Sequence, residues 1–155
     1  MPPVLDVDLA VQKLASLPIE VYQEGSLVLA AGATTGKLLV LKEGAVEVVR
    51  DGVCLAEVSE PSAVFGELAV LLGRPHTADV RALRRSVFHV ADGRSYLRAD
   101  STAALYVAVL LARRLKAVNR HLVEARSLLG QGQPAGVIAE MIDNIAETVR
   151  YGPPL

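Results

Sequence analysis

Residues 65–80 read FGELAVLLGRPHTADV, and they carry the strongest structural signal in the chain. Gly66 and Glu67 open a short apolar run, and the turn Pro-His-Thr-Ala follows at 75–78. Glycine lets a ligand approach the backbone closely, and the unpaired N–H groups of a helix start attract phosphate. The stretch therefore predicts a short helix whose first turn can hold an anion.

Short β-prone runs punctuated by glycine surround this stretch between residues 20 and 92. These runs are VYQEGSLVLAAG, KLLVLKEGAVEVVRDG, VCLAEVS and DVRALRRSVFHV. Asp51-Gly52 lies between valines and predicts a two-residue hairpin of type I′. No helical crossover fits between the runs, so their spacing favours a β-sandwich or barrel over a parallel α/β sheet.

Helical patterns flank the β-prone zone. Residues 6–18 predict a short amphipathic helix that stops at Pro18. From Ser101 a long helix of about 25 residues is expected, with Asp100 or Ser101 as its N-cap and Gly130 at its end. Its apolar residues follow alternating steps of four and three, which predicts an a/d seam of Ala104, Ala108, Leu111, Leu115, Val118, Leu122, Ala125 and Leu129. A final helix is indicated by Ile138, Ile142, Ile145 and Val149.

Composition bounds the class of protein. The 155 residues, 52% of them hydrophobic, suffice for one domain with a full core. A formal net charge of -1 gives no general attraction to nucleic acid or anionic membrane. Cys54 is the only cysteine, no signal peptide is apparent, and the longest apolar run, 103–112, is too short to span a bilayer. These features predict a cytoplasmic protein.

Residues 14–129 resemble the cyclic-nucleotide-binding domain family. The likeness rests on the pair Gly25 and Gly32, on KEGAV at 42–46, and on FGELA at 65–69 followed by a Pro-x-Thr-Ala turn at the family's distance. It implies a mainly β fold with helices, a double-stranded β-helix (jelly-roll) of eight strands with one short internal helix. The expected organisation is an N-terminal helical segment (1–19), a jelly-roll (20–100) and C-terminal helices (101–155).

The resemblance implies a site for the cyclic phosphate and ribose of cAMP or cGMP. Glu67 stands where the family's glutamate accepts a hydrogen bond from the ribose 2′-hydroxyl. Ala69 is small enough for a phosphate to sit against its N–H, and Thr77 offers a hydroxyl to the phosphate or to a purine edge. The expected ligand-binding residues are Gly66, Glu67, Leu68, Ala69, Arg74, His76, Thr77 and Ala78. No catalytic residue, metal or cofactor other than this ligand is expected.

His76 departs from the family, which carries an arginine at this position. A histidine with the reference pKa near ~6.5 offers mainly one neutral donor at neutral pH. The missing charge-assisted contact costs about 1.5–3 kcal/mol, on the order of ten- to a hundredfold in affinity. Arg74 is a candidate replacement within the same loop. Three further arginines are expected on a solvated strand face and its turn, namely Arg81, Arg84 and Arg85.

Three functions remain open on these residues. The first is a cyclic-nucleotide sensor of weakened affinity, in which His76 partly replaces the arginine. The second is a degenerate domain that no longer binds nucleotide and acts as a protein-interaction module. The third, a metal-dependent enzyme on a jelly-roll, is disfavoured because His76, His89 and His121 are scattered along the chain.

The seam on residues 104–129 predicts one of two arrangements, a parallel homodimer or a lid helix packed on its own barrel. Only 26 residues follow Leu129, which leaves no room for a winged helix-turn-helix domain. Neither nucleic acid nor membrane is expected as a partner. An unidentified downstream protein is expected to receive the signal.

Overall fold

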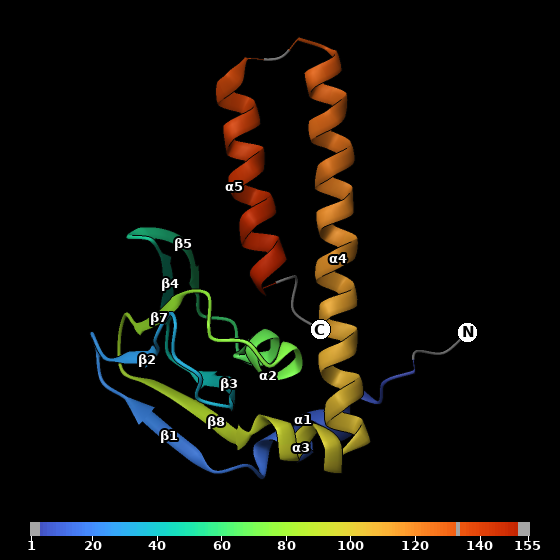
Figure 1. The fold of residues 1–155 in the computed structure, drawn as a ribbon. Helices are drawn as coiled ribbons and strands as arrows, with labels where there is room; N and C mark the ends of the chain where they lie inside the picture. The colour runs from blue at the N-terminus through green and yellow to red at the C-terminus, as the bar shows by residue number, and fades with distance from the viewer. Residues whose placement is uncertain (1–3, 133, 152–155) are drawn as a thin grey trace. The chain divides into compact units, whose positions relative to one another are not determined.

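The computed structural model describes residues 4–132 and 134–151, with side chains placed for 4–132 and 134–143. It divides into two compact units, which we call the N-terminal unit (Met1–Ala108) and the C-terminal unit (Val109–Leu155). All strands of the described residues lie in the N-terminal unit, whereas the C-terminal unit consists of helix (Figure 1). None of the helices in the described part of the chain is long and apolar enough to cross a membrane.

The β structure comprises two antiparallel sheets of four strands each within the described residues. One sheet has the order β1-β8-β3-β6 and the other β2-β7-β4-β5. The strands are β1 (Ile19–Tyr22), β2 (Leu27–Leu29), β3 (Lys37–Glu43), β4 (Val46–Arg50), β5 (Val53–Val58), β6 (Val64–Phe65), β7 (Asp79–Ala82) and β8 (Ser86–Asp92). The mainly β jelly-roll flanked by helices is therefore confirmed.

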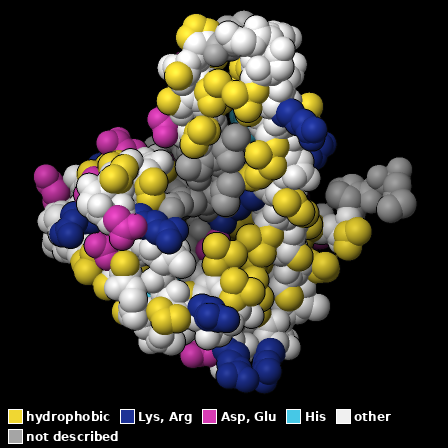
Figure 2. All heavy atoms as spheres, turned by 45° about the horizontal axis from the view of Figure 1, so that its top comes forward, with side chains coloured by type: hydrophobic (Ala, Val, Ile, Leu, Met, Phe, Trp, Pro, Cys, Tyr) yellow, Lys and Arg dark blue, Asp and Glu magenta, His cyan; other side chains and the backbone are white. Residues whose placement is uncertain are grey.

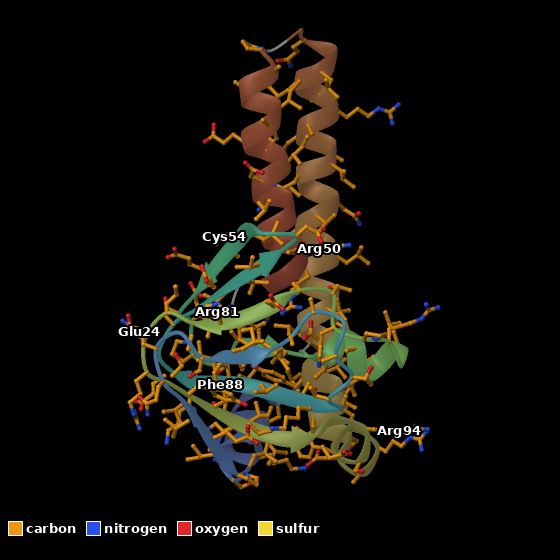
Figure 3. All side chains as sticks on the ribbon, turned by 60° about the vertical axis from the view of Figure 1, so that its left-hand side comes forward. Glu24, Arg50, Cys54, Arg81, Phe88 and Arg94 are labelled. Carbon is orange, nitrogen blue, oxygen red and sulfur yellow. The ribbon has the colours of Figure 1, made fainter. Side chains whose placement is uncertain are left out.

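Strand β8 occupies the centre of the core. It pairs with β1 on one side and β3 on the other, and its first five residues are buried. Phe88 is fully buried, and its ring meets those of Tyr22 and Phe65 edge to face, with centroids 5.7 and 5.9 Å apart. Figure 3 shows Phe88 inside the sandwich, whereas Arg94 points outward. A central strand is covered on both faces, which explains its nearly continuous apolar sequence.

The hairpin between β4 and β5 turns at the residues expected from the sequence. Asp51 and Gly52 both have positive φ, 51° and 78°, as a type I′ turn requires. The pairing shifts register between Val48 and Val49, which marks a bulge beside the turn. The local turn chemistry was therefore sufficient to predict this feature.

The helices begin where side-chain caps satisfy the first backbone N–H groups. Asp6 accepts a hydrogen bond from Leu9 N (3.0 Å) at the start of α1 (Val7–Ala15). Asp100 Oδ1 accepts from the N–H groups of Thr102 (2.9 Å) and Ala103 (3.2 Å) and so starts α4 (Ser101–Gly130). Helix α4 thus begins at the expected cap and ends at the expected Gly130, and it has 30 residues where about 25 were expected.

Helix α3 (Gly93–Ala99) was not predicted. Its only strong local signal is Asp92, whose carboxylate accepts from Ser95 N at 2.8 Å. It is too short to display an apolar repeat, so no periodicity indicated it. Helix α5 (Ala135–Tyr151) was predicted, although the expected apolar side chains at 145 and 149 lie outside the described side chains.

Two different apolar stripes run along α4. In its first turns Ala103, Tyr106 and Val107 are buried, and the Tyr106 hydroxyl donates to the carbonyl of Ser62 at 3.1 Å. None of these residues belongs to the predicted seam. The seam leucines of the C-terminal unit are more than half exposed at three positions, namely Leu115 (61%), Leu122 (53%) and Leu129 (60%). The stripe that is buried within the N-terminal unit was therefore not the one singled out by spacing.

Candidate functional site

The site is built around a glycine that ends β6 and begins a helix. Gly66 has a φ of +84° and precedes the short helix α2 (Glu67–Leu72), which ends at Gly73 with a φ of +61°. A Cβ on Gly66 would collide with the carbonyl oxygen of Lys37 on β3. Both the positive φ and this close approach require glycine, so the predicted tight turn is present.

Glu67 occupies the first turn of α2 and is only 4% exposed. A carboxylate at this depth is retained only where polar groups meet it, because burying an isolated charge is costly. The other polar side chain at this depth beside Gly66 is His76, which is 7% exposed. The structure thus brings Gly66 and His76 together through the fold and adds a buried carboxylate to them.

His76 is held on three sides. The ring nitrogen Nε2 of His76 lies 2.8 Å from the Thr35 hydroxyl. The backbone N–H of His76 donates to Ala33 O (2.9 Å), and its backbone carbonyl accepts from Gly32 N (2.8 Å). Its ring carbon Cε1 lies 3.6 Å from the position that a Cβ on Gly66 would occupy. Burial lowers the pKa of His76, so the imidazole is neutral at pH 7.

Thr35 is the residue that sequence reasoning missed. It lies 41 residues before His76, in the turn that leads into β3, and its hydroxyl also accepts from Lys37 N at 3.2 Å. The segment AAGATTGK at 30–37 contained a weak signal, since threonines between glycines favour a turn with free hydroxyls. Nothing in the segment indicated which loop it would meet.

The neighbouring Lys37 does not supply the missing cation. Its Nζ lies 2.8 and 2.9 Å from the two carboxylate oxygens of Glu20 on β1. The hydrogen bond from Lys37 is the largest of the influences that hold the pKa of Glu20 below its usual value. The Lys37 ammonium is therefore paired with a carboxylate on β1, which is separated from β3 by β8 in the sheet.

The remaining predicted site residues differ in their exposure. Leu68, Arg74 and Thr77 are exposed, whereas Ala69 and Ala78 are partly buried. The backbone N–H of Arg74 donates to Ala69 O at 3.1 Å, which closes the loop after α2.

The arginines expected on a solvated face are exposed, and each contacts an oxygen atom on the surface of the β-sandwich. Arg81 donates to Gly25 O, Arg84 donates to Gly44 O, and Arg85 pairs with a nearby carboxylate, Glu43. Figure 3 shows Arg81 beside the loop that carries Glu24. These arginines are engaged by β-sheet loops at 25 and 43–44, outside the 65–80 stretch.

Metal ligands are not clustered among the described residues, where no group of three or more His, Cys, Asp or Glu side chains could hold an ion. His89 is buried on β8, with Nδ1 3.3 Å from the carbonyl of Leu17. His121 lies on α4 with Nδ1 3.3 Å from the carboxylate of Glu124. Each of these two histidines thus has a polar partner close to it, Leu17 O for His89 and Glu124 for His121.

The sequence pattern of the cyclic nucleotide-binding domain matches residues 19–99. The chain belongs to this family. The match covers the two sheets, α2 and α3, so Gly66 and His76 both lie within the matched residues. No curated protein matches the chain.

Solved structures of this family share the fold. The catabolite activator protein of Thermus thermophilus has a TM-score of 0.58 and 25% identity, and the match covers 92% of this chain and 78% of that one. The N-terminal domain of a Streptomyces coelicolor transcriptional regulator has a TM-score of 0.56 and 28% identity, over 76% and 89% of the two chains. PKAR CBD2 with bound Sp-2Cl-cAMPS has a TM-score of 0.58 at 20% identity, over 89% and 84%. The last likeness concerns the fold alone.

Proposed function

We propose that this domain is a regulatory sensor that binds a cyclic nucleotide, cAMP or cGMP, and is not an enzyme. The observation that carries the proposal is the buried His76 ring beside Gly66, the residue that directly precedes the buried Glu67. Together they supply a close backbone approach for a phosphate, an acceptor for a ribose hydroxyl and one neutral donor. The match of residues 19–99 to the cyclic nucleotide-binding domain family supports this class of ligand.

Each residue has a distinct role in this proposal. The first N–H groups of α2, including that of Ala69, face the cyclic phosphate, and the carboxylate of Glu67 accepts from the ribose hydroxyl. The exposed hydroxyl of Thr77 donates to the phosphate or to the purine edge. His76 donates a single hydrogen bond, which is worth less than a charge-assisted contact and makes binding weak.

The proposal predicts that binding strengthens as pH falls. An anion beside His76 favours its protonated form, so the ligand raises the imidazole pKa that burial has lowered. Protons and nucleotide therefore bind cooperatively, and affinity rises as the pH falls through the imidazole pKa of the nucleotide-bound protein.

Calorimetry with cAMP and cGMP at pH 5.5 and pH 7.5 tests this. We expect tighter binding at the lower pH for the wild type, and no such gain for His76→Gln, which keeps a neutral donor but cannot titrate. Absence of binding at millimolar nucleotide at both pH values would refute the sensor.

The second candidate is a domain that no longer binds nucleotide and serves as a protein-interaction module. The Thr35 hydroxyl already engages His76 Nε2, and α2 exposes three leucines, Leu68, Leu71 and Leu72. An exposed apolar patch on a small helix is typical of a protein contact. A ligand that binds only the native state must raise thermal stability, so a melting shift with cAMP or cGMP rejects this candidate.

We further propose that the domain acts in the cytoplasm as a homodimer through residues 104–129 and signals to a protein rather than to nucleic acid. The exposure of the seam leucines supports the dimer. The net charge of -1 argues against a nucleic-acid partner. Size measurement by light scattering at several concentrations tests the dimer, which a constant monomer mass would contradict.

A further inference from the structure

The C-terminal unit leaves apolar surface uncovered. Its helices α4 and α5 run antiparallel side by side in both ribbon views (Figures 1 and 3). Two helices can bury only the faces that they turn toward each other, and a unit of this size lacks a core of its own. Figure 2 shows apolar side chains gathered on the outer surface of these helices.

The uncovered residues form a regular stripe. Leu115, Leu122 and Leu129 are spaced by seven residues, so they lie on one face of α4, and each is more than half exposed. On α5, Val137 (38%) and Ile142 (56%) are exposed as well. The regular spacing of the exposed leucines on α4 indicates a surface that another helical element covers.

The two helices carry opposite charge. Helix α4 has five basic side chains and one acidic one, whereas α5 has three acidic and one basic. The acidic residue of α4, Glu124, already lies 3.8 Å from Arg120 Nε and 3.3 Å from His121 Nδ1 on the same helix. It therefore has little charge left to offset a second basic helix.

We propose that the C-terminal unit pairs with that of a second copy as a four-helix bundle in which α4 of one chain lies against α5 of the other. The helices then alternate around the bundle, and each basic helix has an acidic neighbour on both sides. The leucine stripe of α4 is covered by the partner's α5. This specifies the homodimer proposed above and does not depend on nucleotide binding.

Direct pairing of the two α4 helices through the same leucines fits the charges less well. In a parallel pair of α4 helices, the exposed or half-buried residues flanking the seam are basic or neutral, including Asn119, His121 and Arg126. No oppositely charged partners are available across such an interface, and the basic side chains repel. The alternating bundle removes this repulsion.

Single-cysteine variants distinguish the two arrangements. Leu122 and Ile142 each lie about two helical turns from the connection between α4 and α5, so they are level in antiparallel helices. In a Cys54→Ser background, chains with Leu122→Cys and chains with Ile142→Cys are mixed and oxidised. We expect a disulfide between unlike chains. Leu122→Cys alone gives no disulfide dimer in the bundle, since the two α4 helices are diagonal and too far apart.

Ser127→Cys is the matched control, because Ser127 is exposed on α4 away from the stripe and should not cross-link to Ile142→Cys. A rapid disulfide between two Leu122→Cys chains would overturn the proposal in favour of the parallel α4 pair. A monomer mass for the wild type at about 100 µM would also overturn it, since interfaces of this kind bind in the micromolar range or tighter.

Substitution of the stripe supplies a second measurement. Leu115→Gln combined with Leu122→Gln should convert the dimer to a monomer, whereas Leu72→Gln, an equally exposed leucine on α2, should leave it a dimer. A dimer that survives the double substitution would refute the bundle. The two outcomes are read from mass by light scattering, so they do not depend on the nucleotide site.

Discussion

Replacing His76 by arginine should restore the phosphate clamp. The native imidazole is neutral because burial lowers its pKa, so its hydrogen bond to a phosphate is worth about 0.5–1.5 kcal/mol. A guanidinium contact to the same anion is worth about 1.5–3 kcal/mol. The difference between the two contacts is about 1–1.5 kcal/mol, so with about 1.4 kcal/mol per tenfold His76→Arg should tighten cAMP or cGMP binding on the order of tenfold.

The same substitution should lower stability in the absence of ligand. Arginine cannot keep the 2.8 Å contact between Nε2 and the Thr35 hydroxyl, and its longer side chain must leave the space beside Gly66. The lost hydrogen bond costs about 1 kcal/mol, or roughly 3 °C in Tm. Lower stability together with tighter nucleotide binding is expected only if the side chain at position 76 contacts the ligand.

Isothermal calorimetry at pH 7.5 measures the affinity, and a thermal melt verifies folding. His121→Arg is the control, because it adds the same charge on α4, outside the 65–80 stretch, and should not change binding. If folded His76→Arg binds both nucleotides no more tightly than the wild type, then either the pocket does not take a cyclic phosphate at this position or the assignment of His76 to it is wrong.

Three other predictions concern the same site. Gly66→Ala should lower stability by about 1–3 kcal/mol, since alanine strains at φ +84° and meets the Lys37 carbonyl, and a melt showing wild-type Tm would contradict this. Glu67→Gln should weaken nucleotide binding at least about tenfold by calorimetry, and unchanged affinity would exclude the ribose contact. The free energy of unfolding should fall as pH drops from the ordinary imidazole pKa toward the lowered pKa of native His76, because the unfolded chain then binds the proton more readily. Urea titrations should show that His76→Gln flattens this part of the profile, and an equal slope in both proteins would assign the titration elsewhere.

Features that depend on neighbouring residues were predictable from the sequence. The Asp51-Gly52 turn, the Asp100 cap and the short helix after Gly66 are set by local backbone preferences and hydrogen bonds, which the sequence displays directly. The strands followed from glycine spacing and β-prone composition. The ligand contacts of the cassette stay predictions.

Features that depend on distant residues appeared only in the folded chain. The contact between Thr35 and His76 joins residues 41 apart, and it gives the histidine a buried, neutral environment that no local pattern indicates. Likewise the step of four and three along α4 showed an apolar face without showing that a second stripe, through Ala103 and Tyr106, is the buried one. Spacing reports which residues share a face of a helix, but burial depends on what the tertiary packing places beside that face. Residues 65–80 were therefore sufficient to predict the turn and the short helix at Gly66. The protonation state of His76 and the exposure of the α4 leucines depend on tertiary packing.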